Sequence, residues 1–252
     1  MQNVIWSREE IKTRARHAMH RTYGKAVLVA ILAGVCTGIV SASFAKTARE
    51  LVSDYSTTFA ETSGTWWTPG LVGLILGAAC AAAVLPVLLQ IFIGNPLFVG
   101  CQTYFRKVDG DADAPGLDTL RRGFETDYLN VTKIMFLRSL FVDLWSLLLI
   151  VPGIIKSYEY MMVPFLLSEN PAMSSDEAFA RSREMMDGQK WNAFVLDLSF
   201  IGWMLLGAVT FGIVTVLYTN PYMYLSRAAL YNTLRGGQTV IDITPAPGGT
   251  ES

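Results

Sequence analysis

Long uncharged stretches rich in apolar residues alternate with charged segments along this chain of 252 residues. Residues 26–45 are 20 consecutive uncharged positions, and residues 198–226 are 29 more. At about 1.5 Å of rise per residue, twenty helical residues match a hydrocarbon core about 30 Å thick. The pattern therefore predicts an all-α fold, a polytopic transmembrane helical bundle.

We expect about six spans, at residues 26–45, 71–94, 134–151, 153–167, 192–209 and 212–231. Pro86 and the Gly94-Asn95-Pro96 triplet are expected to bend or end the second span, because proline removes a helical hydrogen bond. The polar residues 46–70 are expected to form an outer loop. The loop ends with Trp66 and Trp67, which are typical of an interfacial anchor.

The second half of the chain contains a spacing that repeats. Lys133 precedes Pro164 by 31 positions, and Lys190 precedes Pro221 by the same 31. Each interval holds an apolar helix, a turn containing glycine (residues 151–154 and 209–213) and a second helix with a proline. Residues 25–96 resemble the same unit, so three hairpins are predicted. A chance match in an apolar chain is the alternative.

A charged segment comes before each predicted hairpin. Ser7 with Glu10, and Ser174 with Glu177, fit the capping box, so helices are expected to start at the two serines. Residues 117–128 place apolar side chains at helical spacing on one face. We therefore expect a cytoplasmic amphipathic helix before each hairpin.

Charge gives the predicted bundle a direction. Only 16% of the residues are charged, against roughly 25% in soluble domains. The six-span topology places 16 of the 20 Lys and Arg residues on one side and leaves Lys156 on the other. By the positive-inside rule both termini are cytoplasmic. The basic segments are expected to bind anionic lipid headgroups of the bilayer, and no nucleic acid.

Domain organisation follows from the same pattern. Residues 1–235 are expected to form a single integral-membrane domain, and residues 236–252, rich in Gly, Pro and Thr, a disordered cytoplasmic tail. A cleaved signal peptide ending near residues 41–45 is the alternative for the first apolar run. The charged lead of 25 residues is long for that type of segment.

Ionisable residues at membrane depth are the best pointers to function, since each costs about 2.5 kcal/mol or more at a helix centre. Arg138 can snorkel to the cytoplasmic edge, and Lys156 can pair with Glu159 near the outer end. Asp143 and Asp197 either form a structural knot of ion pairs or line a path for an ion, proton or substrate. The candidate intramembrane polar site comprises Arg138, Asp143, Lys156, Glu159, Asp197 and Asn220.

Residues for catalysis are few. His17 and His20 are the only histidines, and the basic residues around them oppose metal binding. Cys36, Cys80 and Cys101 lie in or beside apolar runs and are expected to be core residues. The sequence has no phosphate-binding glycine loop and no nucleophile elbow. We therefore expect no enzyme, metal or cofactor.

Three functions remain in order of preference. The first is a non-enzymatic membrane protein that acts by association with the bilayer and other membrane proteins. The second is a transporter or channel component in which Asp143, Asp197 and Arg138 face a cavity. The third, with least support, is an intramembrane enzyme that modifies lipids.

Several strings of residues resemble a family of bacterial integral-membrane proteins of unknown function. They include residues 144–148 and 151–158, residues 196–203, and Asn220-Pro221-Tyr222. The layout is also loosely similar to the membrane domain of some glycerophosphodiester phosphodiesterases, although no hydrolase domain is present. The resemblance implies a multi-pass protein of the bacterial inner membrane and supplies no catalytic residue.

Overall fold

The computed structural model describes residues 6–61, 84–110, 115–125 and 127–243, and only the backbone at 38–61 and 237–243. All the regular structure within these ranges is helical, which confirms the predicted all-α class. The predictions for Trp66, Trp67, Cys80 and residues 71–83 of the second span lie outside the described residues.

Helix α1 (Arg8–Glu61) starts where the capping box predicts, because the Ser7 hydroxyl accepts a hydrogen bond of 3.1 Å from the Glu10 amide. The helix kinks at Thr22 (φ −127°, ψ 23°), whose hydroxyl donates to the Ala18 carbonyl and so competes with the backbone. The predicted outer loop is wrong for residues 46–61, which continue α1. Residues 39–61 contain neither glycine nor proline to end the helix.

Two π-helices each precede an Asn-Pro pair. The π-helix η1 (Gln90–Gly94) leads into α3 (Asn95–Gly110), and η3 (Thr215–Thr219) leads into α11 (Asn220–Ile243). Proline lacks an N–H, and its ring clashes with the carbonyl four residues back in an α-helix. The wider turn of the π-helix accommodates both effects. The helices therefore continue past Pro96 and Pro221 instead of ending there. Helix α11 also extends to residue 243, beyond the start of the predicted tail.

Helices α5 (Tyr128–Leu148) and α6 (Ile150–Glu159) pack against each other. The chain breaks at Leu149 (φ −155°, ψ 133°), so the turn predicted at 151–154 is wrong, and those residues lie in α6. Pro152 fits in the first turn of α6 because amides there have no helical acceptor. Gly153 lets the two helices approach closely, since a Cβ there would lie 2.6 Å from the Ser146 Cα atom.

The rest of the chain is a series of shorter helices: η2 (Leu117–Arg121), α4 (Arg122–Glu125), α7 (Val163–Glu169), α8 (Ser175–Met185), α9 (Lys190–Leu198) and α10 (Ile201–Val209). The Ser174 hydroxyl accepts a hydrogen bond from the Glu177 amide at 3.2 Å, which confirms the second predicted helix start. Phe211 (φ 53°) and Gly212 (φ 86°) turn the chain between α10 and η3. That turn confirms the prediction at 209–213.

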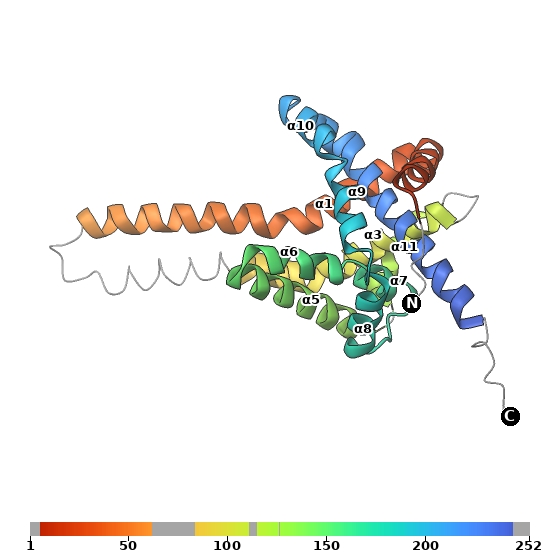
Figure 1. Ribbon diagram of the computed structural model, residues 1–252. Helices are drawn as coiled ribbons and strands as arrows, with labels where there is room; N and C mark the ends of the chain where they lie inside the picture. Colours follow the sequence, from red (N-terminus) through yellow and green to blue (C-terminus); the bar gives the residue numbers. More distant parts are fainter. Residues whose placement is uncertain (1–5, 62–83, 111–114, 126, 244–252) are drawn as a thin grey trace.

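The packed centre lies where α11 contacts α1 and α3, and where α3 contacts α7. Its largest side chains include Tyr104, Phe105, Tyr222 and Tyr231, and Cys36 and Cys101 are also buried. Helices α5 and α6 extend from this centre to the left of Figure 1, and α10 extends to the top. Their ends are strongly apolar and exposed: Leu147 is 86% and Phe211 98% accessible.

Three helices in the described part of the chain are long and apolar enough to cross a membrane: Val84–Gly110, Ile150–Glu169 and Lys190–Val209. Six spans in three hairpins are not supported. Helix α5 carries Lys133, Arg138 and Asp143 along its length, which raises the cost of a crossing. The first predicted span is merged into α1, and its second half has no described side chains.

Candidate functional site

Asp197 is held by two side chains from other helices. The Arg227 guanidinium of α11 lies 2.8 Å from the Asp197 carboxylate, and the Tyr158 hydroxyl of α6 donates to the same carboxylate at 3.0 Å. The Asp197 side chain is only 16% exposed. Asp197 is thus paired with Arg227 and not with Arg138, which makes a different contact. The pair joins α9 to α11 over 30 positions of sequence.

Arg138 contacts the backbone instead. Its Nε donates a 2.8 Å hydrogen bond to the carbonyl of Tyr160, just after the last turn of α6. The carbonyls at a helix C-terminus lack helical partners, and a cation is favourable there. Asp143 is exposed, and within the described residues no ion pair joins it to Arg138. The hydrogen bond gives Arg138 a structural role, and its snorkelling to the membrane edge stays a prediction.

Glu159 lies in the centre of three cations. Its carboxylate is 2.9 Å from Lys156, which confirms the predicted pair, 2.8 Å from Arg183 and 3.2 Å from Lys190. The residue is 4% exposed. Arg183 and Lys190 belong to a segment predicted to be cytoplasmic, whereas Lys156 and Glu159 were predicted to lie near the outer end. The contacts bring the four side chains together, so the two predictions cannot both hold.

Asn220 is structural in this fold. The backbone N–H of Asn220 donates to the carbonyl of Thr215. Asn220 therefore closes the π-helix η3 and begins α11. It lies beside α1, since a Cβ on Gly34 would be 3.9 Å from the Asn220 side chain. The structure therefore separates the candidate residues: Glu159 contacts Lys156, Asp197 contacts Arg227 and Tyr158, and Arg138 contacts a backbone carbonyl.

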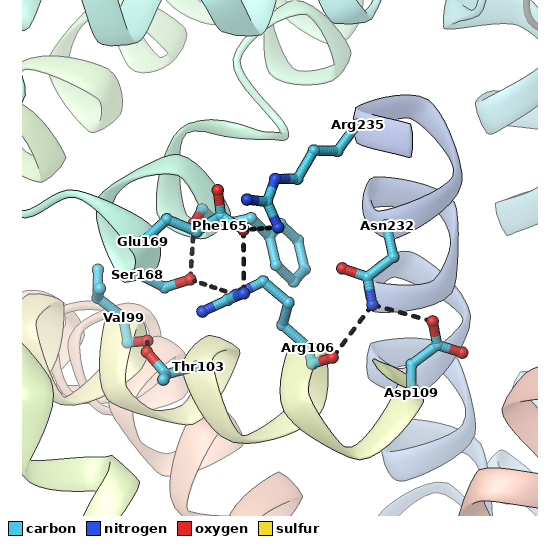
Figure 2. Close-up of polar contacts among 9 residues, drawn as sticks. All are labelled: Val99, Thr103, Arg106, Asp109, Phe165, Ser168, Glu169, Asn232 and Arg235. Atoms are coloured by element: carbon cyan, nitrogen blue, oxygen red, sulfur yellow. Dashed lines mark hydrogen bonds and ion pairs between the residues drawn. The ribbon is translucent and has the colours of Figure 1, made fainter. Parts of the chain in front are cut away.

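A further cluster was missed by the sequence reasoning, and Figure 2 shows it. Glu169, at the end of α7, lies 2.9 Å from Arg106 of α3 and 2.8 Å from Arg235 of α11. Arg106 also donates to the Ser168 hydroxyl at 3.1 Å. The three charged residues come from helices far apart in sequence, so no local spacing could identify them.

Asp109 extends this cluster to α1. Its carboxylate accepts hydrogen bonds from Arg14 at 2.6 Å and from Asn232 at 2.9 Å, and Asn232 also donates to the Arg106 carbonyl at 3.1 Å. The Asp109 side chain is 2% exposed. The network ties α1, α3, α7 and α11 together at one end of the packed centre. The charged groups of this network are paired with one another. This arrangement favours a structural role, in which the network holds the four helices together.

Metal ligands do not gather in the part of the chain that the structure describes, where no three His, Cys, Asp or Glu residues are close enough to share an ion. Each of the four acids that hold helices together, Asp109, Glu159, Glu169 and Asp197, faces one or more cations. An acid that accepts several charge-assisted hydrogen bonds is poorly suited to take a proton from a substrate. The geometry thus favours structural and binding roles.

Comparison with known proteins gives one match. No curated protein and no solved structure matches the chain. A family model described as a protein of unknown function (DUF975) matches residues 134–238, less than half of the chain. The matched region contains all six candidate residues, together with Glu169 and Arg227. Over residues 134–238 the chain is thus similar to a family whose role is uncharacterised.

Proposed function

We propose that this chain is a non-enzymatic, multi-pass protein of a bacterial inner membrane that acts by associating with lipid and with other membrane proteins. The observation that carries the proposal is the exposure of large apolar side chains at the ends of α5, α6 and α10, among them Leu147, Ile150, Val209 and Phe211. Burying one such side chain stabilises a structure by about 1.5–3 kcal/mol. A bilayer provides that burial.

The charges support the same proposal. The ion pairs of Glu159, Glu169 and Asp197 join helices to one another, and Glu159 lies at the opposite end of α6 from the exposed Ile150. Lysine and arginine near a membrane surface contribute about 1 kcal/mol each by attraction to anionic lipid. Such an arrangement places apolar ends in the hydrocarbon and the basic segments of α1 and α8 at the headgroups.

The proposal places both termini in the cytoplasm, which requires an even number of crossings. The three candidate spans would leave the termini on opposite sides. At least one more segment must therefore cross, and residues 26–45 of α1 are the uncharged stretch best suited by length. Six crossings would require residues 134–151 and 212–231 to cross as well.

Reporter fusions test this topology. A reporter that is active only in the cytoplasm should be active after residue 110 and after residue 252. It should also be active after residue 180 if the chain crosses six times, and inactive there if it crosses four times. A reporter that is active only outside should be active after residue 65. Activity of the outside reporter at residue 110 or 252 would contradict the proposal, as would recovery of the whole protein in the soluble fraction without detergent.

A second candidate function is a component of a transporter, and Asp143 is the residue that favours it. Its carboxylate is exposed on the apolar helix α5, and no ion pair involves it in the described ranges. An unpaired acid at membrane depth is costly and is a common mark of an ion or proton path. Asp143→Asn should then abolish proton or cation flux into vesicles, while Glu125→Asn, on the exposed helix α4, should leave it unchanged.

A further inference from the structure

Three basic residues, Arg8, Lys12 and Arg16, lie at intervals of four along the first turns of α1. Residues at that spacing share one helix face, and like charges there repel. Within the described residues, none of the three has a carboxylate within ion-pair distance. In contrast, Arg14 on the same helix is paired with Asp109. The face formed by the three cations therefore has an unbalanced positive charge.

This basic face lines an open, groove-like cavity of about 530 Å³, between α1 and the junction of α9 with α10. The cavity is lined by Ser7, Arg8, Glu9, Lys12, Thr13, Arg16 and Ser199. Its volume is within the range of small-ligand sites, roughly 300–1,000 Å³. The lining contains three cations and a single acid, Glu9, so its net charge is +2.

Hydrogen bonding leaves one hydroxyl free to bind a ligand. Thr13 and Ser199 donate their protons to the carbonyls of Glu9 and Leu196. The Ser7 hydroxyl instead accepts from the Glu10 amide, so its own proton is available. Lys12 is positioned over the ring of Phe200, with 4.9 Å between Nζ and the ring centroid. Burial, Arg8 and Arg16 together lower the pKa of Lys12 below its usual range, and an anion would relieve this repulsion.

The position of the cavity indicates the kind of anion. Ser199 lies directly before α10, whose side chains Ile201, Leu205 and Val209 are exposed. Helix α10 has nine residues, so it rises about 13.5 Å, close to half the thickness of a hydrocarbon core. Figure 1 shows α10 projecting to the top, with the first turns of α1 at the upper right. With α10 in lipid, the cavity lies at the level of the headgroups.

We propose that this cavity binds the phosphate group of an anionic phospholipid, with Arg8, Lys12 and Arg16 balancing its charge and Ser7 donating a hydrogen bond. The inference deepens the proposed membrane association and rests on it. It adds a defined headgroup site to what would otherwise be a general attraction between a basic helix and a negative surface. Arginine suits the phosphate oxygens because its planar fork donates to two of them.

The test uses the whole purified protein in a neutral detergent. Three ligands are titrated separately: short-chain phosphatidylglycerol, phosphatidylcholine of the same chain length, and inorganic phosphate. Binding is followed by calorimetry. Phosphatidylglycerol should bind about tenfold more tightly than either of the others. Inorganic phosphate that bound as tightly as phosphatidylglycerol would overturn the lipid assignment, and equal binding of the two lipids would overturn the site.

Matched variants separate this site from general electrostatics. The triple variant Arg8→Gln/Lys12→Gln/Arg16→Gln should lose about tenfold or more in affinity for phosphatidylglycerol. The control Arg121→Gln/Arg122→Gln/Arg181→Gln removes the same charge from exposed positions and should bind as the parent does. An equal loss in both variants would overturn the proposal. If the triple variant does not fold, Arg8→Gln alone should weaken binding by about threefold.

Membrane fractionation distinguishes a failure of the proposed membrane association from a failure of the proposed headgroup site. The triple variant should stay in the membrane after alkaline extraction, because the apolar ends of α5, α6 and α10 are unchanged. A parent protein that is extracted into the soluble fraction refutes the proposed function. A parent that stays in the membrane but does not discriminate among the three ligands refutes the headgroup site alone.

Discussion

Arg227 of α11 lies 2.8 Å from the carboxylate of Asp197 on α9, and this ion pair joins the final helix to the helix that leads into α10. Both side chains are partly buried, at 31% and 16% exposure. Removing one partner of such a pair leaves the other without its counter-charge in a poorly solvated place. Stability therefore depends on the pair as a unit.

We expect Asp197→Asn to lower the free energy of unfolding by about 1–3 kcal/mol, because the Arg227 guanidinium loses its counter-charge. Thermal unfolding in neutral detergent measures the change. The double variant Asp197→Asn/Arg227→Leu should recover part of the loss. Additive losses in the two single variants would contradict the pairing. Glu177→Gln breaks an exposed pair with Arg181 and should change stability by less than about 1 kcal/mol.

Glu159→Gln should be more damaging, with a loss of about 3–5 kcal/mol, because Lys156, Arg183 and Lys190 all lose the same buried counter-charge. The measurement is again thermal unfolding of the detergent-solubilised protein. Glu125→Gln is the matched control, since it removes one exposed pair with Arg121. A loss no larger than that of the control would show that Glu159 does not hold the three cations together.

Gly153→Ala tests the close packing of α6 on α5. The added Cβ would lie 2.6 Å from the Ser146 Cα atom, which is backbone and cannot rotate away, so we expect a loss of about 1–3 kcal/mol. Gly202→Ala on α10 is the control, because nothing lies within 4 Å of its Cβ. That change should be neutral or stabilise the helix by up to about 1 kcal/mol. Equal behaviour of the two variants would refute the close contact.

The affinity for phosphatidylglycerol should depend on pH through Lys12. Its folded-state pKa is lowered, and an anion in the cavity favours the charged ammonium, so binding is strongest below that pKa and weakens as pH rises through it. Calorimetry between about pH 7 and pH 10 measures the trend.

The groups that face Lys12 are Arg8, Glu9 and Arg16 on its own helix and Tyr222 on α11. Arginine stays charged throughout, so Lys12→Arg should bind independently of pH in this range. A pH dependence that persists in Lys12→Arg would assign the titration to Tyr222 or to the lipid, and would contradict the role of Lys12.

The sequence by itself determined the features that depend on neighbours a few residues away. The helix starts at Ser7 and Ser174 follow from a hydroxyl that reaches an amide three positions on. The turn at Phe211 and Gly212 depends on a backbone conformation that glycine adopts without strain. The Lys156 and Glu159 pair follows from spacing on one helix face. The helical class follows from long apolar runs.

Only the tertiary structure decided which helices meet, and therefore which charges pair. Asp197 with Arg227, and Glu169 with Arg106, join residues that are 30 and 63 positions apart. The break at Leu149, rather than at residues 151–154, depends on the contact of Gly153 with Ser146. Local rules cannot supply these results, because partner choice depends on the packing of helices whose relative positions are fixed by the whole core.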